Sequence, residues 1–209
     1  MKVLMLNSSP HPNGCTKRAL EELTNVLKNE NIETEILTIP LTPIRDCIAC
    51  MKCKENTDNV CIFDDDIVNV LIKKALVSDA FIFSTPVYYA HASARILSVL
   101  DRAFYAGSAA FNHKPGAAIA SARRAGTICS IDELNKYFMI SEMPIVSSTY
   151  WNNIHGMIAS DVEEDLEGLQ TMRNLAQNMA WLLKCIEAGK NTGVVAPIAD
   201  RSHRTNFIS

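Results

Sequence analysis

The chain has 209 residues, of which 48% are hydrophobic and 21% charged, which suits one α/β domain with a sizeable core. Its formal net charge of −3 gives no reason to expect binding to nucleic acid or to an anionic membrane surface. No apolar run reaches the roughly 18 residues of a membrane span, and the start MKVLMLNSSP turns polar too early for a signal peptide. We therefore expect a cytoplasmic protein that binds neither nucleic acid nor membrane.

Strand and helix patterns alternate along the chain. Apolar runs such as KVLMLN, AFIFS and GAAIAS predict buried strands, and apolar residues at three- and four-residue spacing predict helices between them. A capping box from Ser160 to Glu163 predicts the start of the last helix, and Gly189 its end. In chain order we predict a strand at 2–7, a helix around 19–27, a strand at 32–39, an irregular segment at 40–63, a helix at 64–77 with an acidic start, a strand at 80–84 broken by Thr85 and Pro86, a helix at 93–105, a strand at 116–121, a helix at 131–140, a strand at 145–148 and a helix at 161–188.

Five strands that alternate with helices predict a doubly wound, five-stranded parallel sheet with helices on both faces. We expect one domain over residues 1–189, with the irregular segment 40–63 inserted between the second strand and the second helix. Residues 190–209 read as a C-terminal arm that packs on a partner subunit.

The chain has seven cysteines, which is many for a protein in a reducing compartment. Structural disulfides are not expected there, so clustered cysteines point to metal binding or redox chemistry. Cys129 and Cys185 are isolated, and we expect them to be small buried hydrophobic residues. Four others, by contrast, fall within one short segment: Cys47, Cys50, Cys53 and Cys61.

The loop after the first strand, NSSPHPNGCT, leads into a helix at the carboxyl edge of the predicted sheet. Ligands of doubly wound sheets bind at this edge, and the free N–H groups of a helix N-terminus favour an anion such as phosphate. Ser9 and Thr16 add hydroxyl groups, and Gly14 permits close approach of the backbone. An ordinary turn with a Ser/Thr cap explains the loop equally well. The loop is neither G-x-G-x-x-G nor G-x-x-x-x-G-K-[ST], which argues against a Rossmann dehydrogenase and an ATPase.

Two further loops fall on the same edge. After the third strand, Pro86 stiffens a turn, and the adjacent Tyr88 and Tyr89 could flank a flat, electron-rich ring. After the fourth strand, Arg123 and Arg124 could face a reduced flavin or the phosphates of NADPH, although paired arginines are more often simply solvated. The convergence of three loops on one edge favours a cofactor site.

These loops together make the chain resemble the NADPH-dependent FMN reductase and iron–sulfur flavoprotein branch of the flavodoxin-like superfamily. The first family loop, G-S-P-R-x-x-G-N-T, stands here as SSPHPNGCT; the second, S-P-V-Y-W, stands as TPVYY, with a following helix that ends in LDR; and the third stands as RRAGT. The resemblance covers roughly residues 1–151. It implies a flavodoxin-like fold and FMN bound by Ser9, Pro10, His11, Asn13, Gly14, Cys15, Thr16, Pro86, Val87, Tyr88, Tyr89, Ser121, Arg123, Arg124, Gly126 and Thr127.

The cysteine motif C-I-A-C-M-K-C-x7-C places four thiols within 15 residues. Compact C-x2-C-x2-C runs with a further cysteine are a recurring arrangement of iron–sulfur ligands. Zinc, more often held by two separated pairs, a redox-active Cys50/Cys53 pair, and cysteines that hold nothing are the alternatives. The motif also matches that of the iron–sulfur flavoproteins. The resemblance therefore implies a [4Fe–4S] cluster near the flavin, held by Cys47, Cys50, Cys53 and Cys61.

We accordingly predict a flavin-dependent oxidoreductase that moves electrons through FMN and a [4Fe–4S] cluster, with a ferredoxin-like donor and a small-molecule acceptor. One alternative is an NAD(P)H-dependent FMN or quinone reductase without a cluster, and another is a non-enzymatic electron carrier or redox sensor. The cofactor carries the chemistry, so we assign no catalytic side chain. We expect a homodimer or homotetramer in which a neighbour's residues complete the flavin site.

Overall fold

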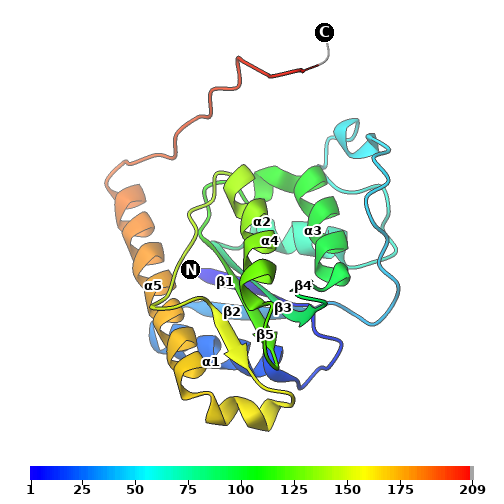
Figure 1. The fold of residues 1–209 in the computed structure, drawn as a ribbon. Coiled ribbons are helices and arrows are strands. Elements are labelled where there is room, and N and C mark those ends of the chain that lie inside the picture. Colours follow the sequence, from blue (N-terminus) through cyan, green and yellow to red (C-terminus); the bar gives the residue numbers. More distant parts are fainter. Residues whose placement is uncertain (208–209) are drawn as a thin grey trace.

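A computed structural model describes residues 1–207 and shows the predicted α/β architecture. Five parallel strands form one sheet in the order β2-β1-β3-β5-β6 (Figure 1), and a sixth, two-residue strand, β4, pairs antiparallel with the end of β3. Within residues 1–207 the strands are β1 (Lys2–Asn7), β2 (Glu33–Thr38), β3 (Ala80–Tyr88), β4 (His91–Ala92), β5 (Gly116–Ala122) and β6 (Asn153–His155).

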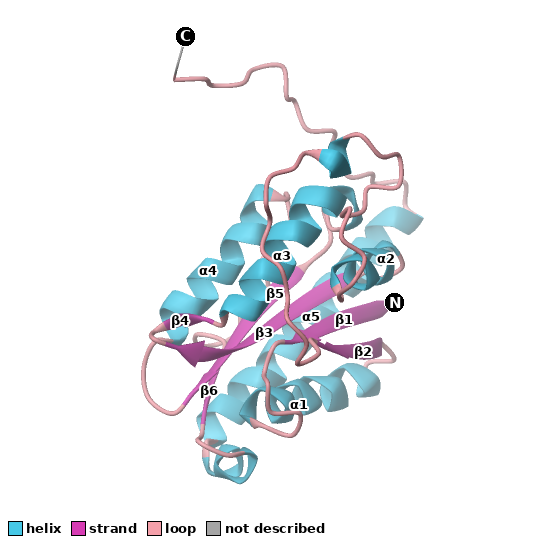
Figure 2. Ribbon diagram, turned by 90° about the vertical axis from the view of Figure 1, so that its right-hand side faces the viewer, coloured by secondary structure: helices cyan, strands magenta, loops and turns pink. Residues whose placement is uncertain are grey.

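Helices cover both faces of the sheet (Figure 2). One face packs against α2, α3 and α4 and the other against α1 and α5, so each face has its own apolar core. The first core contains Phe81 and Phe83 of β3, and the second contains Ile82 between them, because successive side chains of a strand point to opposite faces. The α-helices are α1 (Cys15–Asn29), α2 (Val68–Leu76), α3 (Ala94–Gly107), α4 (Thr127–Ile140) and α5 (Leu166–Asn191), with short 3-10 turns at Lys52–Lys54, Ser108–Ala110 and Ala159–Glu164.

The fifth parallel strand lies later in the chain than predicted. Residues 145–148 are not a strand: Ile145 makes a single bridge to Gly116, and the strand is instead β6, at Asn153–His155. Between these points the chain leaves the sheet and bonds to α5, because the Ser147 carbonyl accepts from Asn178 and the Ser148 hydroxyl donates to the carbonyl of Thr171. The apolar segment after Pro144 therefore runs beside β5 without forming a ladder.

The third strand is longer than predicted, because Thr85 and Pro86 continue it to Tyr88. β1 pairs with β3 only as far as Ser84, whereas β5 remains its partner through Pro86. The N–H of Phe81 points to the β5 side, and N–H groups alternate in direction along a strand. The nitrogen of Pro86 therefore faces the side that β1 has already left, where no ladder bond is lost.

Several helix ends also differ from the predictions. α2 begins at Val68 rather than 64, after Asp66 accepts a hydrogen bond from the Val68 N–H. α4 begins a turn earlier than predicted, directly after Gly126. The Ser160–Glu163 pattern forms a 3-10 turn, and α5 is capped instead by Asp165, whose carboxylate accepts from the Gly168 N–H.

The C-terminus of α5 lies beyond the predicted Gly189. The helix continues to Asn191 and ends in a Schellman motif, with Gly193 at φ +89° and the Val194 N–H bonded to the Gly189 carbonyl. An irregular segment follows over 194–207 and contacts the domain through Arg201, which donates to Glu142. The division into a domain at 1–189 and an arm remains a prediction. Within the described residues, no helix is both long enough and apolar enough to cross a membrane.

Candidate functional site

A cleft of about 450 Å³ opens at the carboxyl ends of β1, β3, β5 and β6, a size typical of small-molecule sites. We call it the edge cleft. All three predicted loops contribute to it. Of the residues predicted to bind the cofactor, its lining contains Ser9, His11, Asn13, Gly14, Cys15, Thr16, Pro86, Val87, Tyr88, Ser121 and Arg123. The lining does not include Pro10, Tyr89, Arg124, Gly126 or Thr127.

The first loop is held by its own hydrogen bonds. The Asn7 side chain accepts from the Ser9 N–H at 3.0 Å, and the Ser9 hydroxyl accepts from the His11 N–H at 3.1 Å. The Ser9 hydroxyl therefore shapes the loop, in addition to bordering the cleft. Gly14 occupies the N-cap position of α1, where no side chain of the described residues caps the helix. The first-turn N–H groups are consequently available to an anion such as a phosphate.

A direct hydrogen bond joins the first loop to the third. The hydroxyl groups of Thr16 and Ser121 lie 2.7 Å apart, although 105 residues separate them in the chain. Both side chains are buried and border the cleft. This bond therefore fixes the loops that follow β1 and β5 relative to each other, at the wall of the edge cleft.

The second loop is a tight hairpin between β3 and β4. Its two central residues, Tyr89 and Ala90, have φ of 50° and 62°, as a type I′ turn requires. Tyr88 borders the cleft, whereas Tyr89 is 99% exposed and points away from the protein. Of the predicted tyrosine pair, only Tyr88 is placed to contact a ligand within one chain.

Gly126 supports this hairpin from outside the cleft. Its φ is +94°, and a Cβ atom built on it would lie 2.6 Å from the Cα of Ala90. Only glycine combines this backbone conformation with so close an approach. Gly126 therefore fixes the position of the hairpin, although it does not itself border the edge cleft.

A fourth loop, residues 156–159, completes the cleft and was not predicted. Asp161 accepts hydrogen bonds from the N–H groups of Met157 and Ile158, and Asp165 accepts from the His155 N–H at 2.6 Å. The sequence pattern predicts the fifth strand at 145–148, too early in the chain, and therefore does not identify residues 156–159 as the loop at its carboxyl end. Gly156 followed by two spaced aspartates was the available signal.

Cys15 lies in the wall of the edge cleft, and its side chain is buried in the apolar core between the sheet, α1 and α5. Burial raises the pKa of its thiol above the ordinary value. A protonated, buried thiol is a poor nucleophile, so the side chain fills space beside the loop and leaves its backbone N–H at the helix N-terminus.

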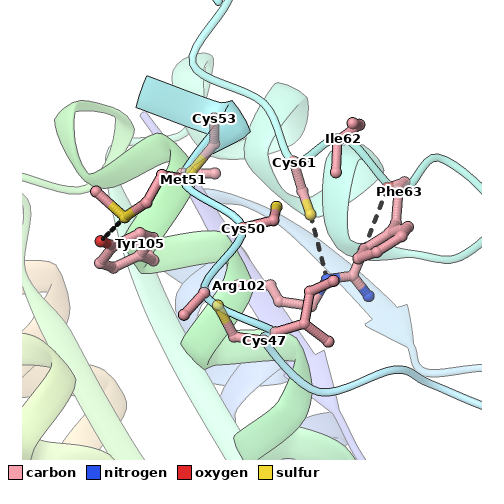
Figure 3. Close-up of a pocket in the computed structure, with 12 residues that line it drawn as sticks. Cys47, Cys50, Met51, Cys53, Cys61, Ile62, Phe63, Arg102 and Tyr105 are labelled. Carbon is pink, nitrogen blue, oxygen red and sulfur yellow. Dashed lines mark hydrogen bonds between the residues drawn. The ribbon is translucent and has the colours of Figure 1, made fainter. Parts of the chain in front are cut away.

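The four clustered cysteines border a second hollow, the cysteine hollow, over the end of α3 (Figure 3). Cys47, Cys50 and Cys53 come from the loop before α2, and Cys61 comes from the return of the same loop. Its remaining lining is mostly apolar and includes Ile48, Ala49, Met51, Ile62, Phe63, Arg102, Tyr105 and Ala106.

The sulfur atoms surround this hollow without converging on one point. Among the described residues, no three histidine, cysteine or acidic side chains lie close enough to hold one metal ion. Cys47 and Cys50 are exposed, whereas Cys53 is buried, and burial raises the pKa of its thiol. Ala49 and Met51, on either side of Cys50, have φ of 52° and 62°. Left-handed residues of this kind recur in loops whose N–H groups face anionic groups, iron–sulfur clusters included.

The edge cleft and the cysteine hollow are separate, and their linings share no described residue. α3 connects them: it begins at Ala94, just after the hairpin, and its third turn carries Arg102. With about 1.5 Å of rise per residue, these two positions are about 12 Å apart along the helix. The remaining cysteines differ from expectation, since Cys129 and Cys185 are exposed on α4 and α5 and not buried.

Comparison with solved structures supports the fold. A flavodoxin from the domain Archaea has a TM-score of 0.59 with 14% identity, over 88% of this chain and 99% of that one. RosB, determined with a bound derivative of riboflavin phosphate, has a TM-score of 0.65 with 13% identity, over 100% of this chain and 96% of that one. At these identities the likeness shows a flavodoxin-like fold.

Sequence comparison adds the family. An iron–sulfur flavoprotein of Methanocaldococcus jannaschii is 31% identical over 90% of this chain and 100% of its own length. An iron–sulfur flavoprotein of Methanosarcina thermophila is 24% identical over 91% of this chain and 100% of its own. Residues 1–156 match the family described as NADPH-dependent FMN reductase. The chain belongs to the NADPH-dependent FMN reductase family, in its iron–sulfur flavoprotein branch.

Proposed function

We propose that this flavin-dependent oxidoreductase holds FMN in the edge cleft and a [4Fe–4S] cluster in the cysteine hollow, and passes electrons between a ferredoxin-like donor and a small-molecule acceptor. The observation that carries the proposal is the gathering of all four motif cysteines around one hollow of a chain whose second site is a flavodoxin-type edge cleft. Relatives named iron–sulfur flavoproteins, similar over nine-tenths of the chain, support it.

The edge cleft fits FMN by its chemistry. The uncapped N-terminus of α1, with Gly14 at its entrance, would receive the phosphate. Tyr88 and Val87 would flank the flat ring, and Arg123 would lie at the open rim. When bound, FMN supplies one- and two-electron redox chemistry. The protein's part is to bind the phosphate, orient the ring and leave one edge open to a partner.

The cysteine hollow fits a cluster by its donor set, because four cysteine thiolates are the usual ligands of a [4Fe–4S] cluster. Cys53 would hold the buried side, and Cys47 and Cys50 the side open to solvent. The loop would close as the four sulfur atoms bind the cluster. Apolar neighbours such as Ile62 and Phe63 would shield the cluster from water.

A second function has its own support. The sulfur atoms do not converge in the described residues, as expected of an NAD(P)H-dependent FMN or quinone reductase that retains the cysteines without a cluster. Arg123, exposed at the rim of the edge cleft, would then face the phosphates of NADPH. A carrier or sensor without turnover is the third possibility and differs by its lack of a small-molecule acceptor.

The test is an anaerobic preparation supplied with iron and sulfide, in which iron and FMN are counted per chain. Reduced ferredoxin and NADPH are then offered separately, and the absorbance of bound FMN is followed with a quinone as acceptor. We expect four irons, one FMN and rapid reduction by ferredoxin. Reduction by NADPH in an iron-free protein supports the second function, and reduction by neither donor contradicts an enzymatic role.

We further propose a cytoplasmic homodimer or homotetramer. All seven cysteines are free thiols in the described residues, which suits a reducing compartment. Tyr89, at 99% exposure beside the edge cleft, and Ile198, at 98% in the C-terminal segment, are apolar surfaces that a second copy would cover. Light scattering of the FMN-bound protein tests this, and a monodisperse monomer would contradict it.

A further inference from the structure

Arg102 is the largest side chain that is almost fully buried, with 2% of its surface exposed. A buried guanidinium is costly unless it is paired and hydrogen-bonded. Arg102 projects from the third turn of α3 into the floor of the cysteine hollow (Figure 3). The function of FMN in the edge cleft gives this side chain no role, because it borders only the cysteine hollow.

The contacts of Arg102 all lie on the cysteine loop and its return. Its guanidinium pairs with the carboxylate of Asp66, which is equally buried. It also donates to the carbonyl groups of Arg45 at 3.3 Å and Phe63 at 3.2 Å. These positions bracket Cys47, Cys50 and Cys53. Arg102 therefore fastens both ends of the cysteine loop to α3.

One contact reaches a cysteine directly. The Nε–H of Arg102 donates to the sulfur of Cys61 at 3.3 Å, as the dashed line in Figure 3 shows. A guanidinium is not deprotonated in proteins, and the hydrogen bonds to Asp66, Arg45 and Phe63 compensate its burial. The hollow thus has a permanent cationic donor aimed at one sulfur, and the donor is held in place by a carboxylate on its far side.

Resting on the proposed function, we propose that Arg102 is a positioning residue for the cluster: it orients Cys61 as a ligand and raises the reduction potential. A hydrogen bond to a ligating sulfur and a nearby positive charge both favour the more negative, reduced state. Reduction brings one electron from the ferredoxin-like donor and no proton. The guanidinium charge offsets the negative charge that this electron adds.

The decisive variant is Arg102→Lys, which keeps the charge near Asp66 but removes the Nε–H donor to Cys61. Arg95→Lys is the matched control, because Arg95 lies on the same helix, contacts the Ile39 carbonyl and borders neither site. A second variant, Arg102→Gln with Asp66→Asn, removes both buried charges together. It leaves no unpaired ion behind if the single change prevents folding.

Each protein is reconstituted anaerobically, its iron and FMN are counted, and both redox centres are titrated by absorbance. We expect Arg102→Lys to bind the added electron about tenfold more weakly at the cluster, a fall of ~59 mV for a one-electron couple. The FMN potential should not change, and the double variant should show a larger fall. Arg95→Lys should match the wild type at both centres.

Equal cluster potentials in the wild type, Arg102→Lys and the double variant would overturn this inference while leaving the proposed function intact. Loss of iron from Arg102→Lys with an unchanged melting temperature would support the positioning role. A wild-type protein that takes up no iron would overturn the proposed cluster, and this inference with it.

Discussion

The two sites are built in different ways. The edge cleft is formed by four loops far apart in sequence, each fixed by the end of a strand and cross-linked by contacts such as Thr16 with Ser121. The cysteine hollow is formed by one long loop, fastened to α3 mainly through Arg102. Contacts between its loops fix the shape of the edge cleft, whereas the four sulfur atoms around the cysteine hollow do not converge among the described residues. The edge cleft therefore depends on the topology of the sheet, and the cysteine hollow on a single loop and its contacts with α3.

The strongest test of this contrast is to replace one cysteine of the cysteine hollow. Cys50→Ser should abolish nearly all cluster binding, because a hydroxyl is a poor substitute for a thiolate ligand. FMN content should stay at one per chain, since Cys50 does not border the edge cleft. Iron and flavin assays measure both. Cys185→Ser, on the exposed face of α5, is the control; equal iron loss in both variants would contradict the assignment.

A backbone change should damage the edge cleft selectively. Gly126→Ala introduces a Cβ 2.6 Å from the Cα of Ala90 at a φ of +94°, so the hairpin that carries Tyr88 must shift. We expect FMN affinity, measured by fluorescence titration, to fall by roughly tenfold or more, with iron content unchanged. Gly193→Ala has the same backbone strain but open space around it. If Gly193→Ala weakened FMN binding as much as Gly126→Ala, the loss of affinity would come from backbone strain in general and not from a shift of the hairpin.

Loss of a single cross-link should have a smaller effect. Thr16→Val removes the hydroxyl that bonds to Ser121 and leaves a buried polar group unpaired, at a cost of about 1 kcal/mol. Because FMN would bind only when the first and third loops keep this arrangement, we expect its affinity to fall by up to roughly fivefold. Thr24→Val is the matched control on the same helix, because its hydroxyl donates to the sulfur of Met5 and it does not border the edge cleft. Unaltered affinity in Thr16→Val would mean that the third loop keeps its place without this bond.

The smallest effect concerns the helices behind the edge cleft. Glu22 of α1 pairs with Arg173 of α5 and with Arg18. Burial opposes its charged form, but the hydrogen bonds from the two arginines lower the pKa of Glu22 below its usual range. A lowered carboxyl pKa stabilises the fold above the ordinary value of about 4.5 and ceases to do so as the pH falls through the lowered value.

Glu22→Gln should therefore reduce the free energy of unfolding by roughly 0.5 kcal/mol at pH 7, and by progressively less as the pH falls below about 4.5. Urea unfolding at several pH values measures this. Glu21→Gln, which alters a more exposed pair with Lys17, should have little effect at any pH. A difference between Glu22→Gln and the wild type that is independent of pH would exclude the ionic explanation.

The sequence allowed much of the fold to be predicted because its strands are short apolar runs with helices between them. Prediction failed where tertiary contacts overrode local signals. Residues 145–148 begin with Ile145 and Val146, as a strand would, but hydrogen bonds to α5 hold Ser147 and Ser148 away from β5. Ser160 and Glu163 match a capping box, yet Asp165 caps α5 instead. Its carboxylate accepts hydrogen bonds from the N–H groups of both Gly168 and His155.

The site was predicted to the extent that it follows strand ends. The glycine and hydroxyl residues of the first loop and the Pro86–Tyr88 segment could be placed because they directly follow predicted strands. The exposure of Tyr89 could not be predicted, because periodicity does not reveal a type I′ turn that points its side chain to solvent. The contact between Arg102 and Cys61 likewise could not be predicted, because the two residues are 41 positions apart in the chain and only folding brings them together.

The most direct test of the central claim is a count of iron and FMN in the wild-type protein after anaerobic reconstitution. If each site holds its own cofactor, we expect four irons and one FMN per chain. Brief exposure to a chelator should then remove the iron but not the FMN. One FMN with no iron, or with a single zinc ion in place of iron, would contradict the claim that Cys47, Cys50, Cys53 and Cys61 hold a [4Fe–4S] cluster.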